Sequence, residues 1–160
     1  MKTRLGFVSN SSSSSFIVIS DTNDIERFNL HHFTWEEYSD NVLLIGAAGE
    51  TEFGWQNEEY NDVNDKINFT WIQAKYMEDN SNSRPMEMLI SVLKEYTNSK
   101  DVKSVLTLSY DDEKGKRWAY IDHQSASSED CNTEMFHDED KLKAFLFNPR
   151  SYIQNGNDNG

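Results

Sequence analysis

The chain has a single cysteine, Cys131, among its 160 residues. An intramolecular disulfide is therefore impossible, which is typical of proteins that work in a reducing compartment. Long apolar runs are also missing, and neither a signal peptide nor a membrane-spanning helix, which needs about 20 apolar residues, can be recognised. We therefore expect a protein of the cytoplasm that has no membrane partner.

Basic residues are scarce, with 15 Lys and Arg against 28 Asp and Glu and a formal net charge of −13. An acidic surface repels nucleic acid and anionic membranes, so neither is an expected partner. Such a surface attracts a protein with a basic surface, or it serves solubility alone.

Motifs that bind cofactors or metals are missing as well. The sequence has no Walker loop, dinucleotide fingerprint, nucleophile elbow or zinc motif. The stretch from Asn61 to Asp65 has the oxygen ligands of a calcium loop but lacks its glycine and its closing glutamate. We therefore expect no cofactor and no metal.

Aromatic residues are plentiful at 12%, which favours a packed core over disorder. Trp35, Trp55, Trp71 and Trp118 are expected to be core anchors. The length predicts one domain over residues 1–160, with a serine-rich lead-in at 1–15 and a polar tail at 155–160.

Short apolar or alternating stretches predict strands at 16–19, 41–46 and 50–55. Residues 102–110 and 117–123 resemble the two arms of a β-hairpin, because Gly115 lies in the polar stretch between them. Residues 151–154 are interpreted as an edge strand or as coil.

Helical spacing of apolar residues predicts a helix over 62–78. A second helix is predicted after Ser83, with Pro85 in its first turn, and a last one between a cap at Asp138 and a stop at Pro149. A short helix is also expected through Ile25 and Phe28.

These elements predict an α+β fold, with a mainly antiparallel sheet and an antiparallel helix pair packed on one face. One core is expected to bury ten residues: Val18, Leu44, Phe53, Ile67, Trp71, Leu89, Leu93, Leu106, Ile121 and Leu146.

The N-terminal segment has a distinctive pattern. Gly6-Phe7-Val8-Ser9-Asn10 is followed by serines and then by Phe16-Ile17-Val18. This segment resembles one that recurs in proteins of tailed bacteriophages, and three shorter strings at 52–55, 121–125 and 147–153 are similar to small phage proteins. The resemblance implies a phage origin and brings no catalytic assignment. We expect the serines to form an irregular surface loop that leads into a strand at 16–19.

Four carboxylates, which we call the acidic strip, precede and open the helix at 62–78: Glu58, Glu59, Asp62 and Asp65. Their role is either to bind a basic protein or to complement the positive end of the helix dipole, a stabilisation of about 0.3–1 kcal/mol each.

His123, at the end of a predicted strand, is a candidate catalytic base, because its pKa is easily tuned. Strand alternation points Asp122 away from it, so the carboxylate partner would be Glu52, which faces away from Phe53, or an acid from the C-terminal loop. The alternative is a histidine that makes a structural hydrogen bond.

We expect a phage accessory protein that works by binding a host or phage protein and performs no chemistry. A nucleic-acid-binding host factor, which has a basic groove, is one such target. Two alternatives are a small hydrolase or transferase that uses His123, and a protein packaged in the virion with its N-terminal segment as the address.

Overall fold

Helix α1 (Val63–Asp79) begins where Asp62 caps it, since the Asp62 carboxylate accepts a hydrogen bond of 2.8 Å from Asn64 N. Helix α4 (Glu139–Phe147) begins in the same way at Asp138, which accepts from Lys141 N at 2.8 Å. The predicted helix over 62–78 and the predicted cap at Asp138 are confirmed.

The structure is a computed structural model that describes residues 2–4, 13–20, 24–28, 41–54, 58–108, 111–121 and 133–157. Besides α1 and α4 it contains α2 (Arg84–Tyr96), a 3₁₀ turn η1 (Glu134–Phe136) and nine strands within this part of the chain. The strands are β1 (Lys2–Arg4), β2 (Ser13–Ser20), β3 (Val42–Ile45), β4 (Glu52–Phe53), β5 (Glu59–Tyr60), β6 (Asp101–Ser104), β7 (Leu106–Leu108), β8 (Arg117–Ile121) and β9 (Tyr152–Asn157).

Helix α2 follows Ser83 as predicted, but the Ser83 hydroxyl does not cap its backbone. Asn82 Oδ1 instead accepts a hydrogen bond of 3.3 Å from Arg84 N. Pro85 lies in the first turn, where a missing N–H costs no helical hydrogen bond.

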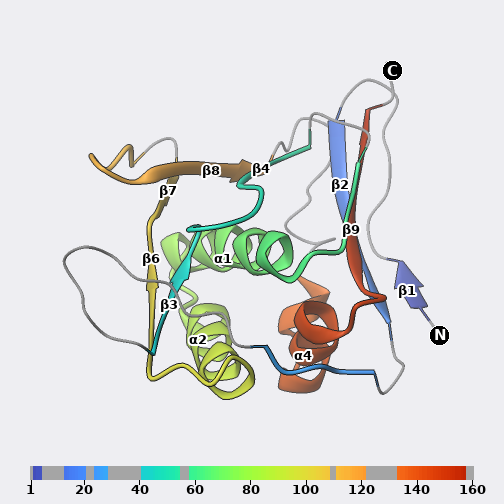
Figure 1. The fold of residues 1–160 in the computed structure, drawn as a ribbon. Helices are drawn as coiled ribbons and strands as arrows, with labels where there is room; N and C mark the ends of the chain where they lie inside the picture. The colour runs from blue at the N-terminus through green and yellow to red at the C-terminus, as the bar shows by residue number, and fades with distance from the viewer. Residues whose placement is uncertain are drawn as a thin grey trace.

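The helix expected through Ile25 and Phe28 is wrong for residues 24–28, which are neither helix nor strand. Glu26 N donates to the carbonyl of Phe147, the last residue of α4, and Phe28 N donates to that of Tyr96, the last residue of α2, each at 2.9 Å. The segment therefore runs across the ends of two helices, as Figure 1 shows. It satisfies carbonyls that have no partner inside those helices, which accounts for its extended course.

Strand pairing is mixed. β1, β2, β9 and β5 form a four-stranded antiparallel sheet in that order, whereas β3 pairs parallel with β6, and β4, β8 and β7 form a parallel sheet. The α+β class is confirmed, but the expectation of a mainly antiparallel sheet is not. The antiparallel orientation of the helix pair on one sheet face stays a prediction.

The hairpin expected from 102–110 and 117–123 is wrong, because β7 and β8 run parallel, with Leu106 opposite Arg117 and Leu108 opposite Ala119. A three-residue strand is only about 10 Å long, so the segment between the two strands can return the chain to the beginning of β7. Arg117 N then donates to Val105 O at 2.7 Å.

β9 is an internal strand, and residues 151–154 are therefore not an edge strand. It pairs with β2 from Ser13 opposite Asn157 to Val18 opposite Tyr152. The serines from Ser13 to Ser15 thus begin a strand, where an irregular loop was expected, while the strand predicted at 16–19 is confirmed. Asn155 to Asn157, expected in the polar tail, supply the partner backbone that orders these serines.

All ten residues predicted for the core are buried. Eight of them belong to one cluster shared by the helices and strands, while Val18 and Leu44 are buried outside it. α1 contacts β3 and β8, and α4 contacts β2, so the helices lie between two groups of strands (Figure 1).

The tryptophans that the structure describes differ in burial. Trp71 is 7% exposed and confirms its prediction, but Trp118, which is 49% exposed, does not. Trp118 is at an outward position of β8, and its indole Nε1 donates to Asp112 Oδ1 at 2.7 Å. Trp35 and Trp55 lie outside the described residues. Within the described ranges, no helix has the length and apolar character needed to cross a membrane.

Candidate functional site

The acidic strip divides into structural and surface carboxylates. Asp62 is the N-cap of α1, and half-buried Asp65 accepts a hydrogen bond of 2.6 Å from Glu50 N. Glu58 and Glu59 are exposed. The helix-terminus explanation therefore applies to Asp62 and Asp65, whereas Glu58 and Glu59 lie at the surface.

A turn at Ala48–Glu50 brings another carboxylate to the strip. Asn68 of α1 donates from Nδ2 to Ala48 O at 2.8 Å and to Glu50 O at 2.9 Å. Gly49 has a φ of +86°, and a Cβ there would lie 2.8 Å from Asp65 Oδ1, so the turn requires glycine. Together with the bond to Asp65, these contacts fix Glu50 against the beginning of α1.

The carboxylates of this region repel one another. Burial raises the pKa of Asp65; the hydrogen bond from Glu50 N opposes that shift, and the charges of Asp62, Glu50 and Glu58 add to it. Burial also raises the pKa of Tyr60, and its side-chain hydrogen bond to Glu58 and the charges of Glu58 and Glu50 raise it further. Glu50, Glu58, Asp62 and Asp65 thus share one region of negative potential.

Lys66 follows the acidic strip in sequence and interacts with the charge of Asp62, but it is only 1% exposed and therefore lies beneath this surface region. Its Nζ donates to Asn148 O at 2.9 Å and to Ser151 O at 3.0 Å, and burial lowers its pKa to about 8. Among the described residues, none of the ion pairs involves Glu58, Glu59 or Asp62.

The candidate catalytic pair is only partly described. β4 and β8 are neighbours, with Glu52 opposite Tyr120 and Phe53 opposite Ile121. Glu52 is exposed while Phe53 is buried, which confirms the predicted alternation of β4. His123 and Asp122 lie outside the described residues, so the catalytic role of Glu52 and His123 stays a prediction. The described ranges contain no group of three His, Cys, Asp or Glu residues placed to hold a metal ion.

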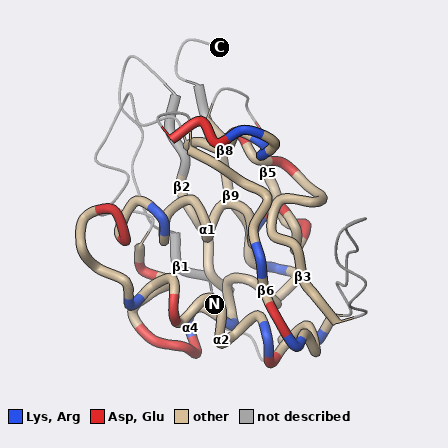
Figure 2. The backbone as a smooth tube through the Cα atoms, turned by 90° about the vertical axis from the view of Figure 1, so that its left-hand side faces the viewer, with Lys and Arg blue, Asp and Glu red and all other residues tan. Residues whose placement is uncertain are grey.

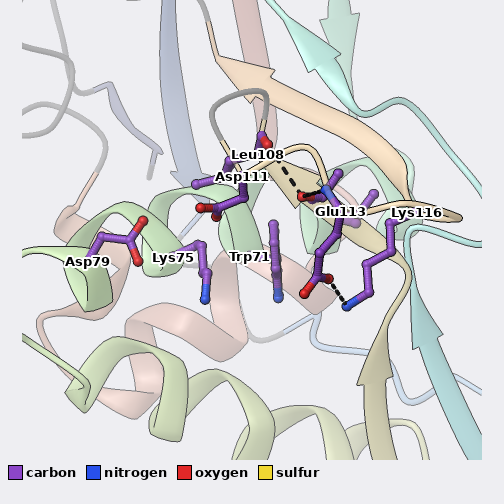
Figure 3. A pocket seen from close by; sticks show the side chains of 9 residues that line it. Trp71, Lys75, Asp79, Leu108, Asp111, Glu113 and Lys116 are labelled. Atoms are coloured by element: carbon purple, nitrogen blue, oxygen red, sulfur yellow. Dashed lines mark hydrogen bonds and ion pairs between the residues drawn. The ribbon is translucent and has the colours of Figure 1, made fainter.

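A pocket of about 410 Å³ lies between the second half of α1 and the connection from β7 to β8 (Figure 3). Trp71, Lys75 and Asp79 line it from α1, at successive spacings of four residues. Thr107 lines it from β7, between two buried leucines that also border it. Three further lining residues come from the connection: Asp111, Glu113 and Lys116.

Hydrogen bonds hold the connection in place. Asp111 N and Asp112 N each donate to Leu108 O at 3.0 Å, and Glu113 N donates to Thr107 Oγ1 at 3.1 Å. Asp112 adopts a φ of +40° and accepts the indole N–H of Trp118. The carboxylate-bearing turn is thus tied to β7 on one side and to Trp118 on the other.

The pocket has a negative end and a neutralised end. Lys75 Nζ lies 3.0 Å from Glu78 Oε1, and this hydrogen bond raises the pKa of the lysine. Desolvation lowers that pKa, while the charges of Glu78, Asp79 and Asp111 raise it further. At the other end, Lys116 Nζ lies 2.9 Å from Glu113 Oε2 and lowers the pKa of that exposed carboxyl. The lysine at the first end is thus paired with Glu78, so the charge of Asp111 leaves that end negative.

This pocket is not apparent from the sequence, because Trp71 is expected in the core and residues 111–116 in a turn. The spacing of Trp71, Lys75 and Asp79 on one helix face was the available signal. The segment facing them could not be inferred, since it depends on the parallel pairing of β7 and β8.

Comparisons with protein-family models, with curated proteins and with solved structures find no match to this chain.

Proposed function

We propose that this acidic domain acts by binding a protein with a basic surface, through the acidic strip and the adjoining Glu50. The observation that carries the proposal is the exposure of Glu58 and Glu59 beside carboxylates that already repel one another. A lysine or arginine brought to this region by a partner relieves that repulsion, because an opposite charge favours the ionised carboxylates.

Acidic residues outside the strip add to the negative potential of the surface. Figure 2 shows acidic positions on several elements, including β5, β6 and α4. Arg117 is bound to the carbonyls of Gly46 and Gly49 at 3.0 and 2.9 Å. Six other described cations lie within 4.0 Å of a carboxylate of the same chain: Arg27, Lys75, Lys116, Lys141, Lys143 and Arg150. Much of the positive charge is therefore already paired within the molecule.

The partner class follows from charge complementarity. Nucleic-acid-binding proteins have basic grooves, and an acidic domain competes there with the nucleic acid. The resemblance of the N-terminal segment to phage proteins supports a role in an infected bacterium, with a host or phage protein as the partner. Packaging in the virion, with residues 1–20 as an address, is the alternative within the same phage setting.

The experiment compares three tagged forms of the chain in pull-downs from bacterial lysate. They are the wild type, the strip variant (Glu58→Lys with Glu59→Lys) and the α2–α4 variant (Glu87→Lys with Asp140→Lys). The third form has the same net charge as the second but changes exposed acids on α2 and α4. Asp62 and Asp65 are left intact because they support the beginning of α1. Thermal melting of all three forms verifies that they are folded.

We expect a basic partner to be retained by the wild type and by the α2–α4 variant, and to be lost with the strip variant. Duplex DNA and salt should both release it, since charges on exposed surfaces are screened over roughly 8 Å at physiological ionic strength. Equal retention by the two variants, or a complex insensitive to both DNA and salt, contradicts the proposal.

A further inference from the structure

The pocket between α1 and the β7–β8 connection has the size of a ligand site, since about 410 Å³ falls within the roughly 300–1,000 Å³ that is usual for such sites. One of its walls is Trp71, whose side chain lies between Lys75 and Glu113 in Figure 3. An indole ring provides an apolar surface and also a face that attracts cations.

One carboxylate of the pocket is available. Asp111 is exposed, and no side chain of the described part of the chain forms a hydrogen bond or ion pair with its carboxylate. Its charge acts on Lys75, which is already paired with Glu78. Asp111 is thus the carboxylate that an incoming cation can engage without breaking an existing pair.

Trp118 lies beside this pocket. The parallel register places it opposite Thr107, which lines the pocket, and its indole is bonded to Asp112, between the lining residues Asp111 and Glu113. Trp118 is a large exposed apolar side chain held in one orientation. Such residues dominate the binding energy of many protein interfaces, because little conformational freedom is lost on contact.

We propose that this pocket receives an arginine side chain of a protein partner, with Asp111 as the counter-ion, Trp71 as the wall and Trp118 as the neighbouring apolar anchor. The nature of the partner rests on the proposed function, whereas the preference of the pocket for a guanidinium group does not. Arginine fits better than lysine because its planar fork bonds to carboxylates and stacks on indole at the same time. An anion is disfavoured by the carboxylates at that end of the pocket.

The experiment uses the full chain and two peptides, acetyl-Gly-Ser-Arg-Ser-Gly-amide and the same peptide with citrulline, which is neutral and of similar shape. Binding is followed by the NMR signals of the indole N–H groups, which are assigned with Trp71→Phe and Trp118→Phe. Asp111→Asn removes the proposed counter-ion. Asp101→Asn is the matched control, because Asp101 is also exposed but lies on β6, outside the pocket.

We expect the arginine peptide to shift the Trp71 and Trp118 signals saturably, and the citrulline peptide to bind about tenfold more weakly, as for the loss of one charge-assisted hydrogen bond. Asp111→Asn should weaken the arginine peptide by a similar factor, while Asp101→Asn should leave its affinity unchanged. Equal binding of the two peptides, an unchanged affinity in Asp111→Asn, or no saturable shift at peptide concentrations of about 10 mM overturns the inference.

The strip variant, Glu58→Lys with Glu59→Lys, separates this inference from the proposed function. It should bind the arginine peptide as the wild type does, because neither residue lines the pocket. If the strip variant loses the basic partner while the peptide fails to bind the wild type, only the pocket inference is overturned. If the peptide binds while the strip variant keeps the partner, only the proposed function is contradicted.

Discussion

Between pH 7 and pH 10, Lys66 is expected to make the free energy of unfolding rise by about 2.5 kcal/mol, and replacing Lys66 with methionine should abolish this rise. Lys66 is 1% exposed, and its ammonium group donates to Asn148 O and Ser151 O at the end of α4 and the beginning of β9. Burial lowers its pKa from 10.5 to about 8, although the charge of Asp62 opposes the shift.

The magnitude follows from linkage. A shift from 10.5 to about 8 means that the charged lysine costs the folded state about 3 kcal/mol, at about 1.4 kcal/mol per pKa unit. The folded state binds fewer protons than the unfolded chain between these two pKa values, so stability rises with pH there. The contribution is present above pH 10.5 and is lost as the pH falls through about 8. Most of that range, about 2.5 kcal/mol, lies between pH 7 and pH 10.

The assay is urea unfolding of the wild type, Lys66→Met and Lys94→Met at intervals from pH 7 to pH 10. Lys94→Met removes an exposed lysine of α2 and is the matched control. Tyr60, whose pKa burial raises, contributes stability that is lost as the pH rises above its ordinary value of 10.0. Tyr60 is present in all three proteins, so its contribution cancels when their pH profiles are subtracted.

At pH 7 two effects on the free energy of unfolding of Lys66→Met oppose each other: the loss of a buried charge raises it, and the loss of a donor to two carbonyls lowers it. The test is therefore the dependence of stability on pH and not its value at pH 7. The free energy of unfolding of the wild type and of Lys94→Met should rise with pH relative to Lys66→Met. Parallel profiles for all three proteins would refute the reasoning, because they would show that Lys66 has nearly the same pKa in the folded and unfolded states.

Three further predictions concern stability, and urea or thermal unfolding measures each. Asp138→Ala should cost about 1 kcal/mol, the usual loss of an N-cap, and Ser83→Ala less than half of that, since the Ser83 hydroxyl caps nothing; equal losses would contradict the assignment of the caps. Gly49→Ala should destabilise more than Gly115→Ala by about 1 kcal/mol or more, because both have positive φ but only Gly49 has neighbours that a Cβ would meet; the reverse order would refute this. Deleting residues 1–14 should lower the melting temperature, because β1 and the first residues of β2 leave their sheet; an unchanged value would show that this pairing contributes nothing.

Local chemistry was sufficient to predict the helices from the sequence. The apolar spacing of α1 and the cap of α4 at Asp138 act within a few residues, so both helices were predicted at nearly their observed bounds. The buried core followed for the same reason, because apolar residues on one face of a helix or strand leave water wherever that face packs.

Only the tertiary structure decided how the strands pair, what the polar segments do and where the pocket lies. Ser13 to Ser15 form a strand because Asn155 to Asn157, far away in sequence, offer matching backbone groups. Residues 24–28 are extended because the ends of two helices need hydrogen-bond donors. Lys66 is buried because two carbonyls meet its ammonium group, and the pocket exists because the parallel β7–β8 connection passes over α1. Backbone hydrogen bonds are nearly alike for every residue type, so the side-chain pattern that located the elements could not identify their partners.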